Sequence, residues 1–76
     1  MKIEKRVMSH GVMFRICLNK NHIDFIVRGK TERDAYINMH LFYPLLEYKL
    51  FSLMEKEPEI KTVNGTVIST WEMTND

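Results

Sequence analysis

Apolar and polar residues alternate along the first part of the chain with the period of two that is typical of β-strands. The alternation runs through residues 12–18 (VMFRICL) and again through residues 22–28 (HIDFIVR), with NKN at 19–21 between them. Asparagine tolerates the backbone of tight turns, so we predict a β-hairpin. A weaker alternation at residues 3–8 predicts a further strand before it. The side chains expected to face inward from the second segment are Ile23, Phe25 and Val27.

The C-terminal segment predicts a second hairpin. Asn64 and Gly65 both accept a positive φ, as the type I′ turn of a two-residue hairpin loop requires. After this turn, one face of the expected strand carries Val67, Ser69 and Trp71. The two hairpins and the first strand together predict an antiparallel sheet of four to five strands.

Between the hairpins, the sequence predicts one long helix. Thr31 is a favoured N-cap residue, and Asp34 stands three residues further on, where a capping box has its acidic member. The helix should end by Glu57, because Pro58 has no N–H to donate and restricts the residue before it. We therefore expect a single domain, residues 1–76, of the α+β class, in which the helix covers one face of the sheet as a second layer.

This helix has more apolar residues than one sheet face can cover. Placed at 100° per residue, they fall into two stripes. The first stripe should pack on the sheet and consists of Ala35, Met39, Phe42, Leu46, Leu50 and Leu53, flanked by Tyr43. The second stripe lies on another face and consists of Ile37, Leu41, Leu45 and Tyr48. A stripe of this kind, if it is exposed, usually marks a binding surface.

Pro44 lies within this segment and leaves two interpretations of the second stripe. Proline removes one helical hydrogen bond and clashes with the carbonyl group four residues earlier, so the helix should either kink or divide in two. A kink could bury Leu45 and Tyr48 against the edge of the sheet. In the interpretation that we favour, the stripe meets another protein, and a homodimer is one form of this.

Composition narrows the class of protein. One cysteine cannot form an internal disulfide, and one cysteine with three scattered histidines predicts no metal site. The first residues are charged without an apolar run behind them, and no apolar stretch is as long as a membrane span. We therefore expect a cytoplasmic protein that does not bind membranes. A single alanine among many Lys, Ile, Asn and Met residues is typical of A/T-rich genomes, phage genomes among them.

Charge is distributed unevenly along the chain. Residues 1–33 hold eight basic and three acidic side chains, whereas residues 34–76 hold three and seven, so net charges of +5 and −4 combine to the overall +1. Three acidic residues at the end of the expected helix could attract a basic protein partner: Glu55, Glu57 and Glu59. The basic residues that could hold an anion or a nucleic acid are Arg15, Arg28, Lys30 and Arg33.

Motifs for catalysis or nucleotide binding are incomplete. The Gly-Lys-Thr at residues 29–31 resembles the end of a P-loop, but Asp24 stands where that motif needs its first glycine. Cys17, His22 and Asp24 hold the groups of a nucleophile, a base and an orienting carboxylate. Strand alternation places them on the side opposite the apolar residues, and no oxyanion donor or pocket is evident. We therefore predict no enzymatic activity and no cofactor.

The sequence thus favours a small non-enzymatic protein that binds another protein, such as a phage-type inhibitor of a host protein. The residues expected at this contact are Ile37, Leu41, Leu45 and Tyr48 with Glu55, Glu57 and Glu59. The alternative is a nucleic-acid-binding protein that uses the basic N-terminal half. It is weakened because Phe14 and Phe25 are expected to face inward, where they cannot stack on bases.

Overall fold

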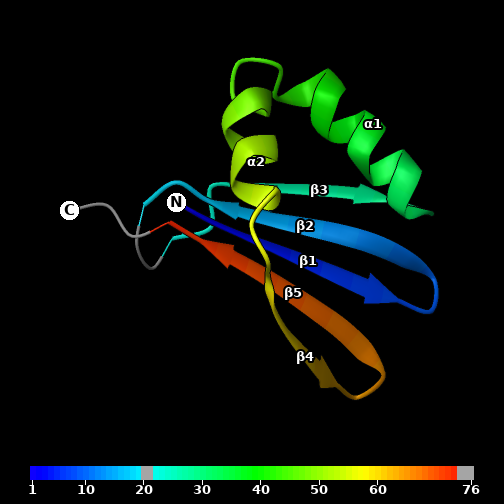
Figure 1. Ribbon diagram of the computed structural model, residues 1–76. Coiled ribbons are helices and arrows are strands. Elements are labelled where there is room, and N and C mark those ends of the chain that lie inside the picture. Colours follow the sequence, from blue (N-terminus) through cyan, green and yellow to red (C-terminus); the bar gives the residue numbers. More distant parts are fainter. Residues whose placement is uncertain (20–21, 74–76) are drawn as a thin grey trace.

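The computed structural model describes residues 1–19 and 22–73 (Figure 1). In chain order its elements are β1 (Lys2–Met8), β2 (Gly11–Cys17), β3 (Phe25–Gly29), α1 (Glu32–Phe42), α2 (Glu47–Met54), β4 (Glu59–Val63) and β5 (Thr66–Glu72). The five strands form one sheet in the order β3-β2-β1-β5-β4, and every neighbouring pair is antiparallel. The α+β class and the antiparallel sheet are therefore confirmed, with five strands and two helices.

The core lies on the face of the sheet to which Ile3 of the central strand β1 points. Ile3 is opposite Ile16 of β2 and Trp71 of β5, and all three are buried. Phe14 and Val27 join them on this face, because alternate residues of a strand point the same way. The buried helix residues that pack in the same core are Ala35 and Met39 of α1 and Leu50 and Leu53 of α2.

Helix α1 begins at the predicted cap. The side-chain oxygen of Thr31 accepts a hydrogen bond of 3.1 Å from the backbone N–H of Asp34. Just before this cap, Gly29 ends β3 in close contact with the first turn of the helix. A Cβ atom at Gly29 would lie 2.3 Å from the backbone nitrogen of Ala35, so a residue with a side chain does not fit there. This glycine allows α1 to start directly against the sheet.

The predicted single helix with a kink at Pro44 is not confirmed, because the structure has two helices separated by residues 43–46. A residue before proline avoids the helical region of backbone space, and Tyr43 accordingly has φ −132° and ψ 51°. Its carbonyl accepts a hydrogen bond from the N–H of Leu46, which closes a turn. Across this turn, His40 Nδ1 of α1 lies 2.5 Å from Glu47 Oε2 of α2, and this contact connects the two helices.

One residue of the first apolar stripe is not where we predicted it. Phe42 is exposed, although it falls on the same side of the helical wheel as the buried Ala35 and Met39. It is the last residue of α1, and the non-helical backbone of the next residue turns Tyr43 toward the sheet instead. The Tyr43 ring packs on Phe25 with ring centroids 4.6 Å apart. A prediction based on a continuous helix could not anticipate this exchange.

The two hairpins differ in how well the sequence predicted them. Asn64 and Gly65 have φ values of 51° and 80°, as a type I′ turn requires. Strand β3, in contrast, begins three residues later than predicted. The Asp24 carboxylate accepts a hydrogen bond of 2.7 Å from the N–H of Leu18, and Asp24 lies outside the strand. Ile23 is exposed and does not face inward as predicted. The predicted turn residues at 20–21 lie outside the described part of the chain.

Candidate functional site

An apolar surface faces solvent where α1 ends and α2 begins. We call this surface the helical corner, and its exposed side chains are Ile37, Leu41, Phe42, Leu45 and Tyr48. Leu45 is 92% exposed and Tyr48 is 73% exposed, so the break at Pro44 does not bury them within the monomer. All four residues of the second apolar stripe are therefore on the surface, and Phe42 is added to them.

The local backbone explains why these side chains point outward. Ile37 and Leu41 are one helical turn apart and share a face of α1, while the positions of α1 that face the sheet hold Ala35 and Met39. Leu45 is in the turn itself, and Tyr48 is in the first turn of α2. The turn therefore presents apolar side chains from two helices at one end of the helical layer.

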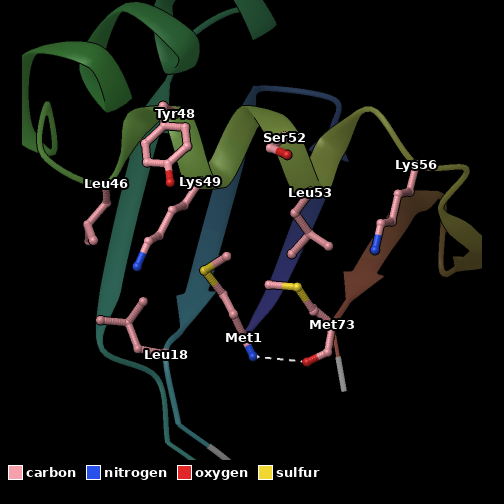
Figure 2. A pocket seen from close by; sticks show the side chains of 9 residues that line it. All are labelled: Met1, Leu18, Leu46, Tyr48, Lys49, Ser52, Leu53, Lys56 and Met73. Carbon is pink, nitrogen blue, oxygen red and sulfur yellow. Dashed lines mark hydrogen bonds between the residues drawn. The ribbon is translucent and has the colours of Figure 1, made fainter. Parts of the chain in front are cut away.

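A hollow of about 590 Å³ lies beside Tyr48, between α2 and the end of the sheet where β1 begins (Figure 2). Apolar side chains line most of it, from residues next to the ends of β1, β2, β5 and α2 and from α2 itself: Met1, Leu18, Leu46, Leu53 and Met73. Two basic side chains, Lys49 and Lys56, reach down into it from above (Figure 2). The hollow can accept an apolar group whose polar end is neutral or negative.

A second hollow, of about 450 Å³, connects the helical corner to acidic residues. Its lining residues are Pro44, Glu47, Tyr48, Phe51, Ser52 and Glu55. Tyr48 lines both hollows, and the two carboxylates stand one helical turn to either side of Phe51. The predicted acidic residues Glu57 and Glu59 follow along the chain and are also exposed. Glu55 therefore lies in the same hollow as Tyr48 of the second apolar stripe.

The four basic residues of the alternative site are only partly brought together. Arg28 and Lys30 are exposed and line one hollow of about 560 Å³ with His10. Arg15 is engaged elsewhere, because its guanidinium lies 3.4 Å from the carboxylate of Glu4. Arg33 is exposed on the first turn of α1.

The aromatic residues that could stack on bases are not on the face that carries Arg15 and Arg28. Phe14 is buried in the core, and Phe25 is on the same side of the sheet and packs on Tyr43. Within residues 1–19 and 22–73, the face with the arginines displays no aromatic ring, because its alternating positions on all five strands hold other residue types. This face therefore lacks the stacking surface that single-stranded nucleic acids usually bind.

In the part of the chain that the structure describes, no hydrogen bond joins Cys17 to His22 or to Asp24. The Asp24 carboxylate is used as a turn acceptor, and its other oxygen lies 3.6 Å from the ring of His22, which is exposed. Cys17 is a free, half-buried thiol on β2. Among the described residues, no cluster of His, Cys, Asp and Glu has the arrangement of metal ligands. Nor does the described chain contain a helix of the length and apolarity that spanning a membrane requires.

Sequence reasoning missed two parts of this site. Phe42 was assigned to the core, although its position just before Tyr43-Pro44 was a signal that the helix ends there. The hollow in Figure 2 joins Met1, Leu18 and Met73 to residues of the α2 segment, and these meet because β1 lies between β2 and β5. No local sequence signal specifies that order of strands. Comparison of the chain with protein-family models, curated proteins and solved structures gives no match.

Proposed function

We propose that this chain is a non-enzymatic protein-binding module, and that the helical corner is its contact surface. The observation that carries this proposal is that all four residues of the second apolar stripe are exposed, from Ile37 at 45% to Leu45 at 92%. Large apolar side chains exposed on neighbouring segments of a small soluble protein are a common mark of a binding surface. Since other residues form the core, the fold does not need the side chains of the helical corner for its stability.

A comparison of the free energy gained by burial with the cost of association favours a contact that extends beyond the helical corner. Burial of an exposed large apolar side chain contributes roughly 1.5–3 kcal/mol, so five of them contribute about 8–15 kcal/mol in total. Association costs an estimated 4–15 kcal/mol in lost freedom of motion. The two terms are comparable, so a stable complex needs further contacts. The two hollows beside Tyr48 are adjacent and supply them.

The charges around the corner indicate the chemistry of the partner. Glu47 and Glu55 flank the hollow that Tyr48 lines, and the exposed Glu57 continues the acidic edge. We infer a partner whose contact surface is apolar at its centre and basic at its rim. Such charges mainly accelerate association and exclude wrong partners. A small protein bound in this way covers the partner's surface, so inhibition of the partner is the expected effect.

Photo-crosslinking identifies the partner and tests the surface together. We would place a photoreactive amino acid at Leu45, and in a matched control at the exposed Glu72 on β5, in cells that express the chain. The proposal expects an adduct with a different protein from position 45 and none with that protein from position 72. With the purified partner, Leu41→Asp and Leu45→Asp should each weaken binding at least about tenfold. Glu55→Lys with Glu57→Lys should slow association, and slow it less at high salt.

Two results would contradict this proposal. One is an adduct from position 45 that contains only a second copy of the chain, or no adduct at all. The other is a partner whose affinity is unchanged by both leucine substitutions while circular dichroism shows that the variants are folded.

Nucleic-acid binding is the second candidate function. The observation that favours it is the hollow shared by Arg28 and Lys30, which has no acidic residue in its lining. A fluorescent oligonucleotide titrated at about 0.05 M and then about 0.15 M salt distinguishes the two candidates, because phosphate contacts lose affinity steeply with salt. The protein-binding account expects no saturable retention. Saturable retention that Arg28→Gln and Lys30→Gln both reduce would favour the alternative.

A further inference from the structure

Strand β4 is an edge of the sheet that the described residues leave open. All five of its residues, Glu59–Val63, are exposed, and within residues 1–19 and 22–73 its one strand partner is β5. Figure 1 shows β4 at the edge furthest from the two helices. An exposed edge strand offers unpaired N–H and C=O groups to any other extended chain.

The opposite edge of the sheet, strand β3, is in contact with helix α1. At β3, the side-chain amide of Asn38 on α1 donates a hydrogen bond of 2.6 Å to the backbone carbonyl of Arg28. Gly29 of β3 is in close contact with the same helix. No described side chain makes a corresponding hydrogen bond to the backbone of β4. The helix thus protects one edge and leaves the other available.

The turn at Asn64 and Gly65 determines which groups of β4 point outward. In a two-residue type I′ hairpin the flanking residues, Val63 and Thr66, form a hydrogen-bonded pair. The backbone groups of alternate residues, Lys61 among them, then also point toward β5. Those of Ile60 and Thr62 point away from the sheet.

The side chains of β4 are self-complementary in one antiparallel register. If Ile60 lies opposite Ile60 of a second copy, then Glu59 lies opposite Lys61 of that copy and Lys61 opposite its Glu59. Two pairs of opposite charge form on one face, and two isoleucines meet on the other. A register with Ile60 opposite Thr62 instead places the two copies of Lys61 face to face, which is unfavourable.

We propose that two copies of this chain pair antiparallel through β4, centred on Ile60, so that their sheets join into one of ten strands. The exposed Ile60 is covered by its counterpart, and the outward backbone groups of Ile60 in each copy bond to one another. The helical corner is formed by residues outside β4, so this dimer leaves it free for a different protein. The proposal therefore goes beyond the function proposed above and does not depend on it.

Charge exchange provides the test, because both charged residues are exposed and their substitution should not disturb the fold. Sedimentation equilibrium over a range of concentrations measures the dissociation constant of the dimer. Glu59→Lys and Lys61→Glu should each raise that constant roughly tenfold, because each replaces two attractive pairs by two repulsive ones. A one-to-one mixture of these two variants should form a mixed dimer as tight as the original, since both of its pairs again have opposite charges. The double exchange E59K/K61E should do the same as a single chain.

Matched controls separate this contact from the helical corner. Glu55→Lys and Lys49→Glu make equal charge changes on exposed residues outside β4 and should leave the dimer unchanged. Leu45→Asp should also leave it unchanged. A protein that remains monomeric at all concentrations would overturn the proposal. So would a dimer that Leu45→Asp dissociates, or one whose dissociation constant does not respond to the charge exchange.

Discussion

At the scale of single residues, Glu4 organises the charges on the sheet face opposite the core. Its carboxylate accepts a hydrogen bond of 2.5 Å from Arg6 and lies 3.4 Å from Arg15. Burial alone would raise the pKa of Glu4, but the hydrogen bond and charge of Arg6, together with the charge of Arg15, outweigh it and hold that pKa below its ordinary value of 4.5. An acid with a lowered pKa in the folded state stabilises the fold while it is ionised.

The stability that Glu4 contributes should therefore depend on pH. It should be fully present above about pH 4.5, where the residue is ionised in both states, and be lost as the pH falls through the lower pKa of the folded state. Glu4→Gln should lower the free energy of unfolding at pH 7 by about 1 kcal/mol, and should reduce the further loss in acid. Urea denaturation at a series of pH values measures both. Glu57→Gln, at an exposed position, should stay within about 0.5 kcal/mol of the wild type at pH 7.

Gly29 is a second residue whose role can be tested on its own. Gly29→Ala brings a Cβ within 2.3 Å of the α1 backbone, and backbone atoms cannot rotate away. We expect the free energy of unfolding to fall by at least about 2 kcal/mol. Gly65→Asn is the control, because asparagine tolerates a φ of 80° and a Cβ at this position would have no atom within 4 Å. This substitution should lower the free energy of unfolding by less than about 1 kcal/mol. Equal effects of the two substitutions would refute the close-contact account.

At the scale of elements, the sequence predicted best where one local interaction decides the structure. The Thr31 cap and the Asn64-Gly65 turn depend on neighbouring residues alone, and both were predicted. The helical segment was harder, because residue periodicity cannot distinguish a kink at Pro44 from a break. The start of β3 was also missed, because residues 22–24 lie outside the strand and the Asp24 side chain accepts a hydrogen bond from the N–H of Leu18.

The contact between Trp71 and the segment after α2 is a further element-scale feature. The indole N–H of Trp71 donates a hydrogen bond of 2.8 Å to the carbonyl of Lys56, which fixes the path from α2 into β4. Trp71→Phe should lower the free energy of unfolding by about 1–3 kcal/mol, through the lost hydrogen bond and the smaller buried ring. Thermal unfolding followed by circular dichroism measures this loss. Tyr48→Phe changes an exposed ring and should have no effect above about 0.5 kcal/mol.

At the scale of the whole molecule, strand order could not be predicted from the sequence. Each hairpin is local, but the position of β1 between β2 and β5 results from packing across nearly the full length of the chain. That order joins Met1 and Met73 by backbone hydrogen bonds and creates the hollow beside Tyr48. The apolar stripe of the helical corner was predictable because one segment of the sequence has more apolar residues than a single sheet face can cover. The open edge at β4 was not, because edges exist only once the order is known.

The central claim is that the helical corner is surplus to the fold and is therefore free to bind a protein. The free energy of unfolding of the double variant L41D/L45D, measured by urea denaturation, tests this most directly. Both side chains are exposed in the structure, so the account predicts a loss of no more than about 1 kcal/mol. A loss of about 4 kcal/mol or more, which is typical of charges placed in a core, would show that these leucines stabilise the monomer and would contradict the account.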